Sequence, residues 1–157
     1  MRVVIDTREQ WPLAFSAEVQ TVRGTLAVGD YSIEGLEDLI VIERKSLSDL
    51  LSSITSGRER FVKELRQLRA FRFAALVIEA RWPDLLTGMW SCPSQVAPNA
   101  VIGSLMSFVV KYGVVPILAD DHQTAGVLTE KLLHIFCRII EKDYREIHAG
   151  KEMEAAK

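Results

Sequence analysis

The chain has 157 residues, of which 48% are hydrophobic and 25% are charged, and its formal net charge is −2. This is the size and composition of one globular domain that buries its own core. A membrane span is excluded because no run of about eighteen apolar residues occurs, and two cysteines without a recognisable signal peptide do not indicate a secreted disulfide scaffold.

The first half of the chain is rich in strand patterns. Residues 2–6 form a short apolar run, residues 18–22 alternate, and residues 24–29 hold two glycines around a short apolar run. The strongest strand prediction covers residues 38–45, because a continuous run of β-branched residues is typical of a strand buried on both faces.

Two helices are expected next. Ser46 and Asp49 match the helix-start pattern [ST]-x-x-[DE] and predict a helix over 47–54. Ser56 and Glu59 repeat the pattern at the start of a basic helix over 57–71. In that helix the apolar residues share one face at helical spacing, and they are Phe61, Leu65 and Leu68.

The second half alternates strands and helices. We expect a strand at 73–79, a loop at 82–97 with a short helix at 83–86, and a helix from Pro98 to Gly113. A strand at 114–118 and a helix at 122–145 follow. The pattern predicts one α/β domain over 1–145, with a mixed central sheet flanked by helices, and a polar, flexible tail over 146–157.

The strand at 38–45 carries charges on both of its faces. Glu43 and Lys45 are two residues apart and should project from one face, with Arg44 on the other. Asp30 lies just before a hairpin that leads back into this strand. Two carboxylates suit a hard cation such as Mg²⁺, and the Lys45 ammonium could orient water or offset charge at a phosphate. A cross-strand salt bridge without any metal is the alternative.

The charges are unevenly distributed along the chain. Residues 1–50 hold nine acids against five bases, whereas residues 58–72 hold six Arg and Lys against two Glu. An acidic region beside a basic segment suits a site that binds cations and a polyanion together. A surface of mixed charge is the alternative.

One long string of residues carries a family resemblance. The stretch "GDYSIEGLEDLIVIERKSLSDL" resembles the signature of the XPF family of structure-specific DNA endonucleases, which reads G-D, a variable hairpin, then E-R-K-x-x-x-D. The resemblance continues in "VVIDTRE", "SSITSGRERFVKELRQL", "ALVIE" and "SLMSFVVKYGVVPILADDHQTA", and so covers residues 1 to about 140. The signature positions are matched by Gly29, Asp30, Glu43, Arg44, Lys45 and Asp49.

The resemblance implies a restriction-endonuclease-like fold and Mg²⁺- or Mn²⁺-dependent hydrolysis of phosphodiester bonds. The expected substrate is branched, flapped or junction DNA in repair or recombination. Asp30 and Glu43 are implied as metal ligands, with Asp6 as a further ligand, and Lys45 as water-activating base or charge stabiliser. The role of Glu9 stays open, and for Asp49 we prefer a helix-capping role.

Six basic residues are candidates for contact with DNA phosphates. The resemblance points to Arg8, Arg44 and Arg58, although a structural ion pair is an equal alternative for Arg44. The basic helix adds three residues that lie off its apolar face, and they are Arg60, Lys63 and Arg66. Trp82 and Trp90 could stack on unpaired bases or simply pack the loop onto the core.

The helix at 122–145 has a wide apolar arc, which spreads over roughly 200° at helical spacing. One face against a sheet needs about half of that, so a second apolar contact is expected, which in the XPF family is a homodimer or heterodimer interface. Burial between two layers of one chain is the alternative. The arc comprises Leu128, Leu132, Leu133, Ile135, Phe136, Cys137, Ile139 and Ile140.

The expected protein is a stand-alone nuclease domain, since residues 146–157 leave no room for the helix-hairpin-helix or helicase modules of larger relatives. We expect it in the cytoplasm with the nucleoid, or in a nucleus, without membrane association or secretion. The rival hypothesis is a non-catalytic subunit that binds DNA junctions or acts as a scaffold and dimerises with an active nuclease.

Overall fold

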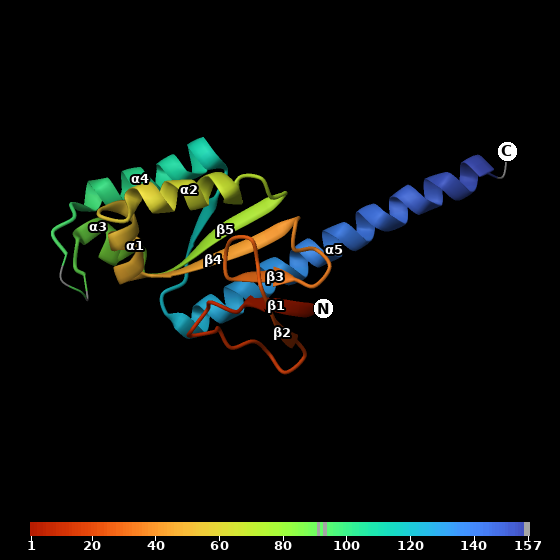
Figure 1. Ribbon diagram of the computed structural model, residues 1–157, viewed down its shortest axis with the longest axis horizontal. Helices are drawn as coiled ribbons and strands as arrows, with labels where there is room; N and C mark the ends of the chain where they lie inside the picture. The colour runs from red at the N-terminus through yellow and green to blue at the C-terminus, as the bar shows by residue number, and fades with distance from the viewer. Residues whose placement is uncertain (91, 93, 156–157) are drawn as a thin grey trace.

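A mixed sheet of six strands forms the centre of the protein (Figure 1). The computed structural model describes residues 1–90, 92 and 94–155, with side chains described through residue 149. The strand order across the sheet is β2-β1-β3-β4-β5-β6. The strands are β1 (Arg2–Asp6), β2 (Gln20–Gly24), β3 (Tyr31–Ile33), β4 (Ile40–Ser46), β5 (Phe73–Glu79) and β6 (Val115–Leu118).

Only β3 runs against its neighbours. It pairs antiparallel with both β1 and β4, whereas β1 with β2, β4 with β5 and β5 with β6 are parallel pairs. The other five strands therefore all end at the same edge of the sheet, which we call the carboxyl edge. Loops at the carboxyl ends of parallel strands are where α/β proteins commonly build their sites.

Helices cover both faces of the sheet, as Figure 1 shows. One face packs on α1 (Leu47–Ile54), α2 (Arg58–Leu68), α3 (Trp82–Thr87) and α4 (Pro98–Tyr112), and the other packs on α5 (His122–Ala155). Alternate residues of β5 supply the two cores: Leu76 and Ile78 face the first group, and Ala75 and Val77 face α5. The predicted fold class, a mixed sheet flanked by helices, is confirmed.

Most of the predicted elements are present. The strand at 73–79 matches β5 in both bounds, and α4 begins at Pro98 and ends before Gly113, which has a left-handed φ of 68°. The strand expected at 18–22 lies at 20–24. The sequence does not distinguish β3 from the hairpin that contains it, because a strand of three residues is too short to show a period of two.

One of the two predicted helix starts is right and one is wrong. Ser46 caps α1: its hydroxyl accepts a hydrogen bond from Asp49 N at 3.1 Å and donates one to Asp49 Oδ2 at 2.7 Å. Ser56 does not cap α2, which begins after Gly57 with no side-chain cap. Gly57 holds this position because a Cβ there would lie 3.2 Å from Ser52 O.

The last helix is longer than expected. Its backbone is helical through Ala155, whereas the sequence predicted an end at 145, and it projects beyond the sheet in Figure 1. Propensity explains the difference, because residues 141–149 contain good helix formers and no proline. In the part of the chain that the structure describes, no helix is long and apolar enough to cross a membrane.

Candidate active site

Strand β4 directs Glu43 and Lys45 to the face that α2 covers. The Lys45 ammonium lies 2.9 Å from Glu43 Oε1 and 4.5 Å from the ring centre of Phe61 in α2. Glu43 is only 6% exposed. The strand period therefore places this acid and this cation together against the helix, as the sequence predicted.

The turn before β3 brings Asp30 beside them. Asp30 N donates to Ile42 O at 2.9 Å, and Asp30 Oδ2 accepts from Arg44 N at 2.8 Å. Gly29 makes this approach possible, because its φ is 80° and a Cβ there would collide with the Val41 side chain. Two backbone contacts thus fix Asp30 against β4 on either side of Glu43.

Burial and mutual repulsion disturb the ionisation of both acids. Burial, opposed in part by the hydrogen bond from Arg44 N, raises the pKa of Asp30 to about 6. Burial and then the charge of Asp30 raise the pKa of Glu43 to about 8. Burial would lower the pKa of Lys45, but the adjacent Glu43 carboxylate outweighs it and raises that pKa. The acids therefore carry more negative charge than their protein surroundings balance.

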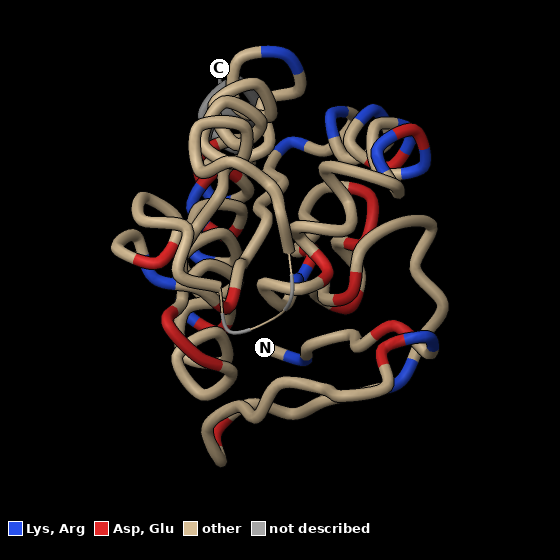
Figure 2. Tube along the Cα trace, turned by 90° about the vertical axis from the view of Figure 1, so that its left-hand side faces the viewer, with Lys and Arg blue, Asp and Glu red and all other residues tan. Residues whose placement is uncertain are grey.

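A cleft of about 610 Å³ opens over these residues at the carboxyl edge. One wall is the loop before Asp30 together with Arg8, and the opposite wall is α2. The helix contributes a polar stripe at i, i+3, i+4 and i+7, which lies on one helical face and comprises Arg60, Lys63, Glu64 and Gln67. Figure 2, which looks onto this edge, shows acidic and basic positions interspersed along it.

The donor set of the cleft fits a hard divalent cation. Asp30 and Glu43 offer carboxylate oxygens, and Mg²⁺ is commonly held by one or two carboxylates, with waters and phosphate oxygens completing the coordination. A cation there would also offset the repulsion that raises both pKa values. Among the residues that the structure describes, no group of three or more His, Cys, Asp or Glu is placed to hold a metal.

Asp6 is not available as the further ligand that the sequence suggested. Its carboxylate accepts hydrogen bonds from Arg8 N, from the Arg8 guanidinium at 2.6 and 3.1 Å, and from Leu26 N at 2.7 Å. Burial opposes ionisation, but these donors hold the pKa of Asp6 below its ordinary value. Asp6 thus organises the two loops that follow β1 and β2, and Arg8, fixed by it, lines the cleft.

Arg44 lies on the opposite face of β4, in a buried ion-pair network. Its guanidinium is 2.6 Å from Glu79 Oε1 and 3.6 Å from Glu9 Oε2, and His122 Nδ1 lies 2.7 Å from the same Glu79 oxygen. The prediction that Arg44 contacts DNA is therefore replaced by its alternative, a structural ion pair. Glu9 also joins this network and does not line the cleft.

The comparisons with known proteins agree with this architecture. The family model of the ERCC4 domain matches residues 5–132, which is most of the chain. The chain belongs to the ERCC4 domain family. The ERCC4 domain also resembles a protein of Methanocaldococcus jannaschii that is described as an ATP-dependent RNA helicase, with 25% identity over 130 residues. That match covers 82% of this chain and 15% of the helicase.

Two solved structures share the fold of this ERCC4 domain. XPF from Aeropyrum pernix matches with a TM-score of 0.68 and 21% identity over 86% of this chain and 61% of that one. The same protein in complex with DNA matches with a TM-score of 0.69 and 22% identity over 87% and 65%. The chain thus spans less than two thirds of these XPF chains, and it shares with them the predicted mixed sheet flanked by helices.

The other predicted residues of the ERCC4 domain divide between the cleft and its surroundings. Arg60 and Lys63 line the cleft, but Arg66 does not. Arg58 turns toward α4, where its guanidinium lies 3.3 Å from Ser104 Oγ. Asp49 is the capping acid that we preferred. Sequence reasoning missed Glu64, although the spacing of four from Arg60 on an amphipathic helix places both on one face.

The two tryptophans also differ. Trp90 packs against the core, which supports the packing alternative, whereas Trp82 stays 46% exposed at the start of α3. Trp82 is thus accessible to solvent, whereas Trp90 contributes to packing of its loop onto the core.

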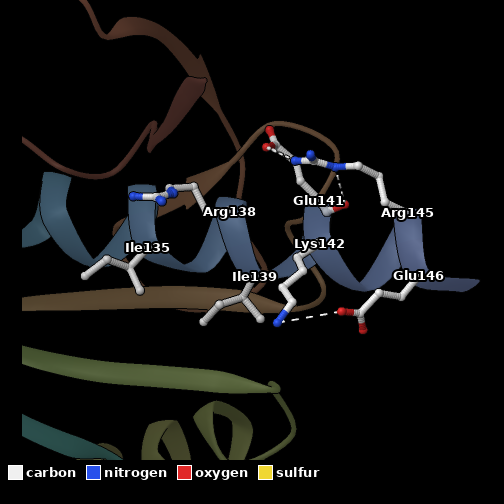
Figure 3. A pocket seen from close by; sticks show the side chains of 7 residues that line it. All are labelled: Ile135, Arg138, Ile139, Glu141, Lys142, Arg145 and Glu146. Carbon is white, nitrogen blue, oxygen red and sulfur yellow. Dashed lines mark hydrogen bonds and ion pairs between the residues drawn. The ribbon is translucent and has the colours of Figure 1, made fainter.

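The apolar arc of α5 is only partly used by the sheet. Leu133 and Phe136 are buried in the core, whereas Ile135 and Ile139 remain 56% and 44% exposed. Figure 3 shows both isoleucine side chains extending from the same side of the helix, beside a hollow of about 550 Å³ that lies away from the acidic cleft. The excess apolar surface predicted from the sequence is therefore present.

Proposed function

We propose that this ERCC4 domain is a metal-dependent DNA endonuclease that hydrolyses phosphodiester bonds at branched, flapped or junction DNA, in repair or recombination. The observation that carries the proposal is the pair of carboxylates, buried Glu43 and half-buried Asp30, beside Lys45 in a cleft that Arg8, Arg60 and Lys63 also line. Membership of the ERCC4 family and the similar XPF structure, which is in complex with DNA, support it.

The roles follow from the positions of the side chains. Asp30 and Glu43 would hold Mg²⁺ or Mn²⁺, because they supply the oxygen donors that these ions prefer. Lewis-acid polarisation of the phosphate and a more readily ionised water are the chemistry that such a cation supplies when bound. Lys45, whose ammonium donates a hydrogen bond to Glu43 Oε1 and lines the cleft, would offset charge that grows on the phosphate in the transition state.

The basic residues of the cleft orient the substrate. Arg60 and Lys63 line the α2 wall, and Arg8 lines the opposite wall beside the loop before Asp30. A DNA backbone that enters between these walls meets cations along its phosphates while one phosphate lies over Asp30 and Glu43. Contacts of this kind bind phosphates and do not read bases, which agrees with recognition of DNA shape.

Cleavage of a labelled flap with and without Mg²⁺ tests the proposal. Asp30→Asn and Glu43→Gln should abolish metal-dependent cleavage, because each removes a ligand charge, while folding and DNA affinity stay within about threefold of the original. Glu18→Gln is the matched control, since Glu18 is an exposed acid that does not line the cleft. Retained Mg²⁺-dependent cutting by Glu43→Gln would contradict its role as a ligand.

The non-catalytic alternative has one observation in its favour. No group of three or more His, Cys, Asp or Glu side chains in the described part of the chain is placed to hold a metal ion. If the unmodified chain bound flaps tightly but cut none of them with Mg²⁺ or Mn²⁺, the domain would be a junction-binding or scaffold subunit instead.

We also propose that the domain dimerises through α5. Exposed Ile135 and Ile139 on one side of the helix form an apolar strip that an aqueous surface does not favour. Sedimentation at micromolar concentration should therefore show a dimer, and Ile139→Glu should yield a folded monomer because it would place a charge in the interface. A monomer in the unmodified chain would contradict the dimer.

A further inference from the structure

A second hollow adjoins the acidic cleft. It has a volume of about 470 Å³ and lies between α1 and the start of α2. Lys45 and Arg60 line both hollows, so the two hollows adjoin at these residues. The second hollow is lined by Arg44, Lys45, Asp49, Ser52, Ser53, Ser56, Gly57 and Arg60.

The start of α2 presents free amide groups here. Gly57 N donates to Ser52 O at 2.9 Å and Arg58 N donates to Thr55 O at 3.2 Å. Glu59 N and Arg60 N have no such acceptor among the described residues, and no side chain caps this helix. The first amides of a helix, together with its dipole, attract anions.

An independent observation comes from α1. Ser53 is only 6% exposed as a residue, and its hydroxyl makes no hydrogen bond to any residue that the structure describes. Its oxygen is not fully enclosed by protein, and Ser53 lines the hollow. An anion bound in the hollow would therefore accept a hydrogen bond from a hydroxyl that no protein group uses.

The charges around the hollow also favour an anion. Arg60 has no ion-pair partner within 4.0 Å among the described residues, whereas Lys45 and Arg44 are paired with carboxylates. Asp49 is the one acid that lines the hollow, and its carboxylate already accepts a hydrogen bond from the Ser46 hydroxyl. Asp49 keeps its negative charge, but Arg60 forms no ion pair with it or with any other described acid, so the Arg60 guanidinium is available to an anion.

We propose that this hollow is a phosphate subsite that binds the DNA phosphate next to the one that is cut. The inference rests on the proposed nuclease function. A strand that places one phosphate over Asp30 and Glu43 and passes Lys45 and Arg60 carries its neighbouring phosphate toward the amides of Glu59 and Arg60 and the Ser53 hydroxyl. The subsite would fix the register of the strand without reading its bases.

Inorganic phosphate is the first probe, and its binding is monitored through the backbone amide signals in NMR spectra. Saturable shifts are expected for the amides of Glu59 and Arg60, with a dissociation constant on the order of millimolar. Ser53→Ala should weaken binding about three- to tenfold, the usual effect of one hydrogen bond. Ser107→Ala in α4, outside the hollow, should not. Shifts that do not saturate, or that spread equally over all basic surfaces, would overturn the proposal.

DNA with a single methylphosphonate, which removes one phosphate charge, is the second probe. With the Asp30→Asn chain, neutralising the phosphate beside the cut position should lower flap affinity, and this loss should shrink in the presence of Ser53→Ala, because both changes act on the same interaction. Independent, additive losses would overturn the subsite. A chain that binds phosphate saturably at Glu59 and Arg60 but never cuts DNA would overturn the nuclease function and leave the subsite standing.

Discussion

The two faces of strand β4 carry the same kinds of charge with opposite outcomes. On the α2 face, Glu43 and Asp30 share a single close cation, Lys45, and both acids have raised pKa values. On the α5 face, Arg44 lies between Glu9 and Glu79, and His122 completes the network. The first face opens into a cleft, and on the second face Glu9 and Glu79 each lie within 4.0 Å of the Arg44 guanidinium.

The comparison separates charges that other side chains of the protein neutralise from charges that a bound ion or phosphate could neutralise. The α5 face is satisfied by ion pairs from three separate segments, so it fixes the loop after β1 and the start of α5 against the sheet. On the α2 face, burial and mutual repulsion oppose the ionisation of both acids, which lie in a cleft, and this suits a site where a cation and a phosphate bind. Adjacent residues of one strand thus take opposite roles because their side chains point to opposite faces.

The largest effect is expected at Lys45. Lys45→Ala should lower the cleavage rate about a hundredfold or more with little change in DNA affinity, because the ammonium should act mainly in the transition state. Single-turnover cleavage and flap binding, measured separately, check this. If the loss appeared only as weaker binding, Lys45 would bind the DNA backbone and would not act in the cleavage step. The α2 face would then have a binding role and no shown catalytic role.

The other face should respond through stability. Arg44→Ala leaves Glu9 and Glu79 buried without their cation and should lower the free energy of unfolding by about 3 kcal/mol. Chemical denaturation measures this loss, and calorimetric binding of Mn²⁺ should show little change in the folded variant. Arg2→Ala, which breaks an exposed pair with Glu34, is the control and should cost under about 1 kcal/mol. Unchanged stability in Arg44→Ala would argue that the network is not structural.

Stability should depend on pH because of the acids on the α2 face. Their folded pKa values, about 6 for Asp30 and about 8 for Glu43, lie above the ordinary values of 3.8 and 4.5. A raised pKa stabilises the fold below the ordinary value, and this contribution is lost as the pH rises through the folded value. Without divalent ions, the free energy of unfolding should therefore fall from about pH 4.5 to 8.5, by a few kcal/mol.

Glu43→Gln sharpens this test, because it removes the more strongly shifted group. Denaturation curves of this variant should show a flatter pH dependence and greater stability at about pH 8. Glu146→Gln, an exposed acid on α5, should leave the curve unchanged. A parallel curve for Glu43→Gln would mean that its carboxylate ionises freely in the folded protein.

The smallest effect concerns the salt dependence of DNA binding. Arg60 and Lys63 line the cleft, so replacing both with Ala should reduce the slope of log affinity against log salt by about 0.9 for each duplex phosphate that the variant no longer neutralises. Arg66→Ala on the same helix is the matched control, since Arg66 is exposed outside the cleft. Equal changes in slope for Arg66 and for the Arg60 and Lys63 pair would indicate a diffuse basic surface.

Sequence periodicity predicted most elements of the fold and the shared face of Glu43 and Lys45, whereas Asp30 as their partner came from the expected hairpin and the resemblance to the XPF family. The β-branched run at 40–42 fixed β4, and the period of two placed Glu43 and Lys45 on one face. Pro98 and Gly113 marked the ends of α4 because the preferences of proline and glycine are local. Signals of this kind depend on neighbouring residues and are therefore readable from the sequence.

Only the tertiary structure decided what each charged side chain contacts. Asp6 and Glu9 stand in the same motif as candidate ligands, yet Asp6 binds Arg8 and Leu26 N, and Glu9 binds Arg44. Glu79 and His122, which complete the Arg44 network, come from β5 and α5, far from Arg44 along the chain. A charge is neutralised by whatever the fold brings within a few ångströms, and sequence spacing does not encode that distance.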